Sequence, residues 1–150
     1  MKAKLHADGG ARGNPGPAGI GVVLADPSGE VIAEIARGIG DATNNVAEYS
    51  AVIAGLELAL ERGVTEIDVY MDSELVVSQL KGDWKIKNDR LRVLAVKARA
   101  LLNRFEKFSI QHVPREMNAD ADKLANQGMD VAMLDHEAEI ESPGQQSFLD

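Results

Sequence analysis

Apolar and polar residues alternate along five stretches of the chain, which indicates β-strands. These stretches span residues 2–8, 19–25, 30–38, 66–71 and 107–113. In the first of them Ala3, Leu5 and Ala7 share one face. The turn Asp-Pro-Ser-Gly at residues 26–29 leaves the second and third strands so close in sequence that they must form an antiparallel hairpin.

Apolar residues recur every three or four positions in four further stretches, which predicts helices. These span residues 46–62, 73–81, 89–105 and 118–133. Gly63 and Gly82 end the first two, and Asn118 is the candidate N-cap of the last. The resulting order, βββαβααβα, is typical of a mixed five-stranded sheet with helices packed against it. Because a helix precedes the fourth strand, we expect that strand to run parallel to a neighbour in the sheet.

The regular pattern fades after residue 133, and Ser142-Pro143-Gly144 interrupts what remains. We therefore divide the chain into a domain of residues 1–133 and a loose acidic tail of residues 134–150. Residues 145–149, Gln-Gln-Ser-Phe-Leu, weakly resemble a peptide that docks on a sliding clamp. A packed or idle tail is the favoured interpretation.

Composition limits the classes of protein to be considered. The chain of 150 residues has no cysteine, which excludes disulfides and thiolate metal sites. It shows no run of apolar residues long enough to span a membrane and no basic, apolar leader, so we expect a protein that is not exported and has no membrane partner. The absence of cysteine is compatible with the cytoplasm, where we expect a monomer. A net charge of −8 argues against nucleic acid, but residues 81–107 carry nine basic and three acidic side chains, a local charge of +6. The alternative for this basic segment is an ordinary solvated helix face.

Four carboxylates fall at junctions between predicted elements: Asp8, Glu48, Asp72 and Asp122. Three have local explanations, because Asn45-x-x-Glu48 fits a capping box, Asp72 can cap a helix and Asp122 can complement a helix dipole. If the first and fourth strands are parallel neighbours, however, Asp8 and Asp72 leave the sheet at the same edge. Four clustered carboxylates repel one another and require divalent cations. Oxygen ligands without His or Cys favour Mg²⁺ or Mn²⁺ over Zn²⁺.

A stretch rich in glycine and proline follows Asp8, at residues 9–19. With so little side-chain bulk, its backbone can bend sharply and lie close to a partner. A carboxylate beside such a stretch suggests a metal-bound, polyanionic substrate.

Four blocks of the sequence resemble the signature blocks of the type 1 ribonuclease H family, in the family's order. They are Asp-Gly-Gly-Ala-Arg-Gly-Asn-Pro-Gly at residues 8–16, Thr-Asn-Asn-Val-Ala-Glu at 43–48, Tyr-Met-Asp-Ser at 70–73 and Asp-Ala-Asp-Lys-Leu-Ala at 120–125. The resemblance, over residues 2–130, implies an α/β ribonuclease H-like fold with sheet order 3-2-1-4-5, strand 2 antiparallel and helices on both faces. It also implies endonucleolytic cleavage of the RNA strand of an RNA–DNA hybrid.

The same resemblance makes Asp8, Glu48, Asp72 and Asp122 the catalytic, metal-binding quartet. Two Mg²⁺ ions about 4 Å apart, with Mn²⁺ as a substitute, can activate a water and stabilise the leaving 3′-oxygen, so no nucleophilic side chain is needed. Within the quartet we assign Asp8 as the bridging ligand, Glu48 and Asp72 to the flanks of the ions, and Asp122 to the second ion.

Candidate substrate contacts lie in the same blocks. Backbone and amide groups there can meet ribose 2′-hydroxyls, and Thr43 and Arg12 are candidates for phosphate or sugar. The first group comprises Gly9, Gly10, Gly13, Asn14, Asn44 and Asn45. For Asn44 and Asn45 the alternative is turn formation and helix capping. Glu74 stands where many members of the family carry glutamine, which puts donation from this position in doubt.

The sequence departs from the best-known members of the family at two places. The connection at residues 114–118 is short and lacks the family's loop histidine. Arg115 is our first candidate to replace it, because a guanidinium pairs with phosphate, ahead of Glu116 and His112.

The second departure is that only residues 82–88 stand in place of a basic protrusion. Trp84, Lys85 and Lys87 are candidates to grip the DNA strand by stacking and charge. The alternative for Trp84 is that it fills a gap between helices.

Two other functions compete with the ribonuclease H interpretation. The chain could be a catalytically silent module that binds hybrids or duplexes, although an intact quartet argues against this. It could also be another nuclease of the same fold, such as an exonuclease, an integrase or an enzyme that cuts double-stranded RNA. Exonucleases usually carry Asp-x-Glu on the first strand, whereas two glycines follow Asp8 here.

Overall fold

A single five-stranded sheet forms the centre of the computed structural model, which describes the backbone of residues 1–149 and side chains as far as residue 138. The strand order is β3-β2-β1-β4-β5, with β2 antiparallel to both of its neighbours and β4 parallel to β1 and β5. The strands are β1 (Lys2–Ala11), β2 (Gly16–Ala25), β3 (Val31–Ala42), β4 (Glu66–Met71) and β5 (Lys107–His112). The predicted order and directions are therefore confirmed.

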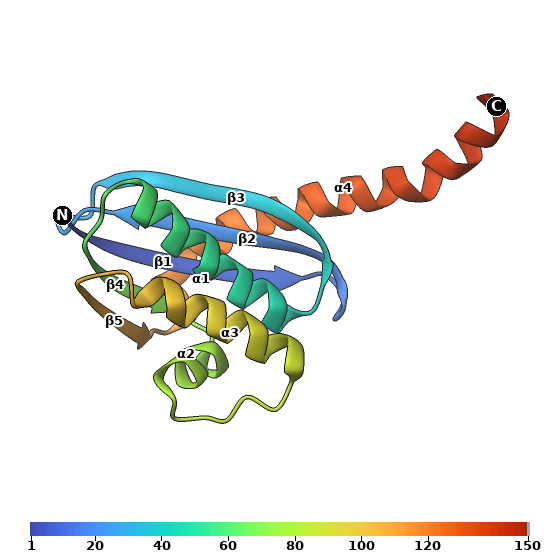
Figure 1. Cartoon of the computed structure of the whole chain (residues 1–150). Helices are drawn as coiled ribbons and strands as arrows, with labels where there is room; N and C mark the ends of the chain where they lie inside the picture. Colours follow the sequence, from blue (N-terminus) through green and yellow to red (C-terminus); the bar gives the residue numbers. More distant parts are fainter. Residues whose placement is uncertain (150) are drawn as a thin grey trace.

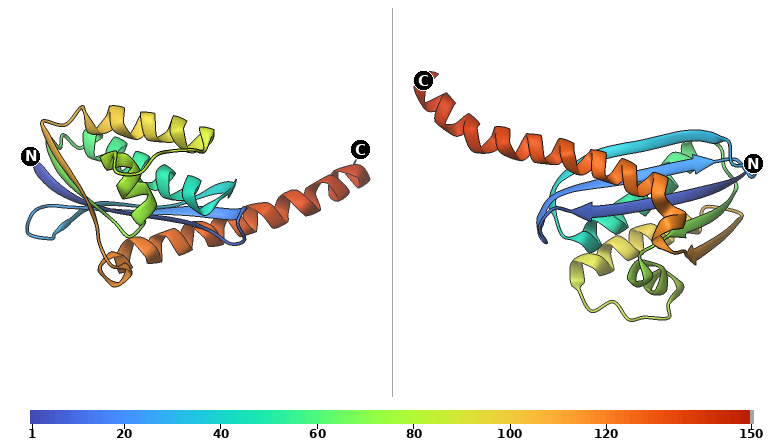
Figure 2. Two further views of the ribbon diagram at one scale, coloured as in Figure 1. Left: turned by 90° about the horizontal axis from the view of Figure 1, so that it is seen from below. Right: turned by 180° about the vertical axis from the view of Figure 1, so that it is seen from behind.

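Helices cover both faces of this sheet, as predicted (Figures 1 and 2). On one face α1 crosses the central strands and α3 packs on α1, while α4 crosses the opposite face over β2 and β3. The helices are α1 (Asn44–Glu61), α2 (Glu74–Lys81), α3 (Asp89–Leu102) and α4 (Ala119–Leu149), and the short turn η1 (Arg115–Asn118) precedes α4. Alternate residues of β1 and β4, such as Leu5 and Val69, point into the core beneath α1 and are fully buried.

Three strands are longer than the sequence pattern predicts, and one of them, β2, begins at Gly16 instead of residue 19. β1 continues through the glycines to Ala11, because Gly9, Gly10 and Ala11 still pair with β2. The prediction that β1 ends at Asp8 is therefore wrong, but its parallel pairing with β4 does stop earlier, at His6 opposite Tyr70. β3 likewise runs to Ala42 instead of residue 38, and α1 begins soon after it, at Asn44.

The start of α1 also differs from the prediction. Thr43 is the N-cap, and its hydroxyl accepts a hydrogen bond from the Val46 N–H at 3.2 Å. The expected capping box of Asn45 and Glu48 does not form, because Glu48 lies in the second turn of the helix. Its carboxylate is therefore free to point toward β1.

α4 lies unusually close to the sheet because small residues meet at the contact. A Cβ atom added at Gly21 would collide with the Ala121 carbonyl, and one added at Gly19 would collide with the Met129 amide. These two glycines allow the helix to rest on the backbone of β2, which fixes the position of the first turns of α4.

The last helix does not end near residue 133 as predicted but continues to Leu149, and its end projects beyond the sheet in Figure 1. Residues 134–141 contain neither glycine nor proline and include Leu134, Ala138 and three Glu, so local propensity favours helix there without packing. The predicted clamp-docking residues 145–149 lie outside the part of the chain whose side chains are described. Within the described residues, no helix has both the length and the apolar character needed to cross a bilayer.

Candidate metal centre

Three carboxylates from distant parts of the sequence meet at one edge of the sheet. Asp8 comes from β1, Glu48 from α1, and Asp72 follows directly after β4. Each of them has a carboxylate oxygen within 4.8 Å of those of the other two. Asp8 and Glu48 are both only 7% exposed, and Asp72 is partly buried.

The topology explains how these carboxylates come together. The parallel ladder between β1 and β4 ends at His6 and Tyr70, and two residues further along each strand the chain reaches Asp8 and Asp72. The third carboxylate depends on close packing at Gly9, because a Cβ atom there would collide with the Ala47 carbonyl of α1. The Gly9 N–H donates to Oε1 of Glu48 at 2.5 Å, which holds this side chain beside Asp8.

The electrostatics of the cluster oppose three negative charges in the absence of a cation. Burial raises the pKa of Asp8, and the neighbouring charges of Glu48 and Asp72 raise it further. Burial also raises the pKa of Glu48, against the opposing effect of its hydrogen bonds. Among the described residues, none of the salt bridges involves Asp8, Glu48 or Asp72. Buried oxygen ligands without a basic partner are the donor set that suits Mg²⁺ or Mn²⁺.

The fourth predicted ligand, Asp122, lies across the same cavity but outside the close cluster of three. It stands in the first turn of α4, as predicted, and its Oδ1 lies 3.5 Å from the Arg115 guanidinium. Both residues line the cavity of about 490 Å³ that also holds Asp8, Glu48 and Asp72. The Arg115 side chain is 76% exposed, so its charge is available at the rim. The other two candidates from that region, Glu116 and His112, do not line this cavity.

Asn118 is a residue of this site that sequence reasoning missed. We expected it to cap the last helix, but its Nδ2 donates to the Ala7 carbonyl at 3.0 Å and to Oδ1 of Asp72 at 3.2 Å. An Asn just before a helix is typical of a cap, and its actual partners lie 111 and 46 residues away in sequence. No local pattern could have indicated them.

Most of the predicted substrate-contact residues surround this cavity or its neighbour. Gly9, Gly10, Arg12, Asn44 and Asn45 line the cavity with the carboxylates. A second cavity of about 480 Å³ shares Asn45 and is lined in addition by Asn14 and Thr43. The last of the set, Gly13, has a φ of 85° in the turn between β1 and β2, a conformation that favours glycine.

Several of these side chains already have partners within the protein. Oδ1 of Asn44 accepts from the Ala11 N–H at 2.8 Å, and the Asn44 N–H donates to Oδ1 of Asn14 at 3.0 Å. Arg12 forms an ion pair with Asp130 of α4. These contacts fix the glycine-rich end of β1 between α1 and α4.

Residues 82–88, which are part of the basic segment, connect α2 to α3. Trp84 is 45% exposed, which argues against the alternative that it fills a gap between helices. Trp84, Lys85 and Lys87 do not line the cavity of the metal centre.

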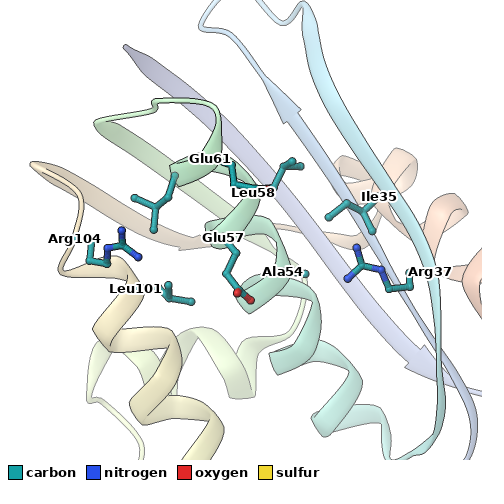
Figure 3. Close-up of a pocket in the computed structure, with 9 residues that line it drawn as sticks. Ile35, Arg37, Ala54, Glu57, Leu58, Glu61, Leu101 and Arg104 are labelled. Atoms are coloured by element: carbon teal, nitrogen blue, oxygen red, sulfur yellow. The ribbon is translucent and has the colours of Figure 1, made fainter.

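A larger hollow, of about 590 Å³, lies elsewhere, between β3, α1 and the end of α3 (Figure 3). Arg37, Glu57 and Arg104 contribute side chains of both signs to its walls. It contains no cluster of acidic residues comparable to the one formed by Asp8, Glu48 and Asp72, so it is not the metal centre.

Comparison with known proteins places this geometry in a family. The sequence matches the family described as "Reverse transcriptase-like" over residues 6–128. Ribonuclease HI of Halobacterium salinarum is 49% identical over 131 residues, which cover 86% of this chain and 66% of that protein. A crystal structure of RNase H1 from the same organism superimposes with a TM-score of 0.86 at 47% identity, covering 88% of this chain and all of the other, 100%. The chain belongs to the ribonuclease H family.

Two further structures have the same ribonuclease H fold. The N-terminal RNase H domain of a Mycobacterium tuberculosis protein gives a TM-score of 0.88 at 49% identity, covering 91% of this chain and 99% of that domain. LC11-RNase H1, solved in complex with an RNA/DNA hybrid, gives a TM-score of 0.83 at 43% identity. The match covers 87% of this chain and 99% of that one. A bifunctional protein of M. tuberculosis is 53% identical over 134 residues, which are 88% of this chain. The chain spans about a third of that relative's length, 36%.

Proposed function

We propose that this ribonuclease H domain is an endonuclease that hydrolyses the RNA strand of RNA–DNA hybrids. The observation that carries the proposal is the cluster of Asp8, Glu48 and Asp72, which have carboxylate oxygens within 4.8 Å of one another in a cavity that the glycine-rich end of β1 also lines. The similarity to RNase H1 proteins, one of them solved with an RNA/DNA hybrid, supports this choice of substrate.

The residues that would hold the cations are Asp8, Glu48 and Asp72, with Asp122 across the cavity. Two divalent ions, Mg²⁺ or Mn²⁺, would supply the activation of water and the stabilisation of the leaving 3′-oxygen. The role of the protein is to hold these carboxylates oriented toward the cations, although burial disfavours the charged forms of Asp8 and Glu48. No side-chain nucleophile is required by this chemistry.

Arg115 is our candidate for the place of the family's loop histidine. Its guanidinium is exposed at the rim and 3.5 Å from Asp122, so it can pair with a substrate phosphate without leaving the site. An Arg115→Ala variant should turn over more slowly, whereas full turnover would reject this role.

Recognition of the RNA strand falls to the residues around Gly9, Gly10 and Arg12. The backbone there is free of bulky side chains, and Asn44 and Asn45 lie beside it on the first turn of α1. Because Oδ1 of Asn44 accepts from Ala11, its amide NH₂ is the group that remains to donate to a ribose 2′-hydroxyl.

A phosphate of the other strand fits the neighbouring cavity of about 480 Å³. This cavity is lined by the N-caps of α1 and α3, Thr43 and Asn88, and by Arg90 in the first turn of α3. Helix N-termini present free N–H groups and a positive dipole end, which favour anions. The exposed Trp84 with Lys85 and Lys87 would extend the contact along the DNA strand.

A cleavage panel tests the proposal directly. Hybrid, RNA duplex, DNA duplex and single strands are each incubated with Mg²⁺ and with Mn²⁺, and Asp8→Asn serves as the inactive control. We expect cleavage of the RNA strand of the hybrid alone. Binding without cleavage would favour the silent module, and cleavage of the RNA duplex would favour the double-stranded RNA nuclease. The cytoplasmic location and the monomeric state remain predictions from composition.

A further inference from the structure

We propose that Asn118 is a positioning residue that orients Asp72 and ties it to β1 at the metal centre. The inference rests on the metal site of the proposed function and adds a residue that supports the ligands without being one. It begins from an amide that is 1% exposed, although Asn is a residue type that is mostly found at the surface.

The two donors of this amide join the two strands that carry carboxylates. One N–H of Nδ2 meets the carbonyl of Ala7, directly before Asp8, at 3.0 Å, and the other meets Oδ1 of Asp72 at 3.2 Å. The backbone ladder between β1 and β4 has already ended at His6 and Tyr70. Asn118 therefore links the two strands where their backbones no longer pair.

The surroundings determine which way the amide points. Both groups in contact with Nδ2 are acceptors, so the reverse orientation would place the amide oxygen against two other oxygens. In the observed orientation Oδ1 of Asn118 is buried and has no hydrogen-bond partner among the described residues. Leaving a buried acceptor unpaired is unfavourable. A residue retained for stability alone would be apolar here, so we infer that its two donors are what the site requires.

The chemistry of the donor explains why an amide suits this place. Asp8 and Glu48 repel the carboxylate of Asp72, and the hydrogen bond from Asn118 to Oδ1 of Asp72 holds that group in the cluster. A lysine or arginine would hold it more strongly, but its charge would compete with the cations. A neutral donor orients the ligand and leaves its negative charge available.

Metal affinity of the free protein tests this role without hybrid cleavage. Mn²⁺ is titrated calorimetrically into wild type, Asn118→Ala, Asn118→Leu and the matched control Asn103→Ala, which lies on the exposed C-cap of α3. We expect about 10- to 100-fold weaker binding in both Asn118 variants and unchanged binding in the control. The KM for hybrid should change little. A folded Asn118 variant that binds Mn²⁺ as tightly as wild type would overturn the proposal.

A measurement on the unaltered side chain covers the case in which neither variant folds. In wild-type protein, the Asn118 side-chain NH₂ should exchange slowly with solvent and its NMR signals should move when Mg²⁺ is added. In Asp72→Ala its exchange should become faster. Fast exchange of this NH₂ in the wild type would show that the amide does not hold Asp72. The same conclusion would follow if its signals responded neither to Mg²⁺ nor to Asp72→Ala. If the wild-type protein does not cleave hybrid but its Asn118 NH₂ signals respond to Mg²⁺ and to Asp72→Ala as expected, the proposed function is rejected and this inference stands.

Discussion

Asp8 is a residue at which stability and chemistry oppose each other. Burial raises its pKa above the ordinary 3.8, so the folded, metal-free protein binds a proton more tightly than the unfolded chain does. The stability that this proton contributes is fully present below pH 3.8 and is lost as the pH rises through the folded-state pKa. We therefore expect the metal-free protein to lose stability from mildly acidic to alkaline buffer, and Mg²⁺ to restore it.

Asp8→Asn separates this effect from other ionisations. The neutral amide removes the charge without changing the shape, so the variant should be about 1–2 kcal/mol more stable than wild type in neutral, metal-free buffer and should show a flatter pH profile. Thermal unfolding of the two proteins over a range of pH, with EDTA and with Mg²⁺, measures the difference in stability and its pH dependence. A variant as pH-dependent as the wild type would show that Asp8 is not the group responsible.

How far sequence reasoning succeeds at the residue scale depends on how local the signal is. The clustering of Asp8 with Asp72 could be predicted, because the ends of two parallel strands share an edge of the sheet. Asn118 could not, because its partners are set by packing between segments 111 and 46 residues apart. The N-cap of α1 could not be chosen from the sequence either, because Thr43 and Asn45 are both good N-cap types and only the backbone conformation decides for Thr43.

At the scale of elements, the contact between α4 and β2 decides where Asp122 stands. A methyl group at Gly21 would collide with the backbone of Ala121, one residue before Asp122. Because backbone cannot yield as a flexible side chain does, Gly21→Ala should destabilise the protein by about 1–3 kcal/mol and displace the start of α4. Hybrid cleavage should fall with it.

Gly29→Ala is the matched control for that change. Gly29 lies in the turn between β2 and β3, where an added Cβ atom meets nothing within 4 Å and only the φ of 96° opposes a side chain. We expect a modest loss of stability with cleavage unchanged when both variants are measured well below their melting temperatures. An equal loss of activity in the two variants would show that cleavage does not depend on the position of α4.

The segment between α2 and α3 supports a prediction about binding. Lys85 and Lys87 are the basic residues next to the exposed Trp84, and each pairing of a lysine with a phosphate releases counterions. The double alanine variant should bind hybrid more weakly, and the slope of log affinity against log salt should fall by about 1 for each phosphate that is no longer neutralised. The control is Lys2→Ala, at the end of β1 that is farther from Asp8, and it should leave the slope unchanged. An unaltered slope in the double variant would remove this segment from the interface.

The boundaries of elements show why the sequence pattern is only partly sufficient. The pattern predicts β4 with its observed bounds, Glu66–Met71, because its alternation is flanked by clear breaks. It places the ends of β1 and β3 too early, because glycine and polar residues there are typical of loops. Pairing with β2 holds them in the sheet, and this pairing joins segments that no short window of sequence contains.

For the whole molecule, the distribution of charge reconciles an acidic protein with a polyanionic substrate. The net charge of −8 would repel nucleic acid if it were spread evenly. Basic residues are instead concentrated in residues 81–107, on and before α3, whereas the acidic cluster of Asp8, Glu48 and Asp72 is largely buried. With cations bound, that cluster no longer repels phosphate. Hybrid binding should accordingly become stronger when divalent cations are added, because they neutralise the acidic cluster, which the basic segment does not do.

We propose that the domain ends near residue 133, where the burial of α4 against the sheet ends. Ala132 is buried against Gly38, and Asp130 pairs with Arg12, whereas Leu134 is exposed. Beyond residue 133, the pair between His136 and Asp41, at 3.6 Å, lies on the surface, where such pairs contribute at most about 1 kcal/mol. A chain cut after residue 133 should therefore keep its fold and its cleavage of hybrid, with a free energy of unfolding within about 1 kcal/mol of the full chain.

A chain cut after residue 128 provides the contrast. It loses the Asp130 pair and the burial of Met129 and Ala132, which pack against the glycines of β1, β2 and β3. Removing one large buried side chain alone costs about 2–5 kcal/mol, and the freed end of α4 would also release Arg12 beside the metal centre. Urea unfolding and hybrid cleavage of the two truncated chains, measured beside the full one, distinguish the two boundaries. If the chain ending at residue 133 unfolds as readily as the chain ending at residue 128, the projecting part of α4 belongs to the domain.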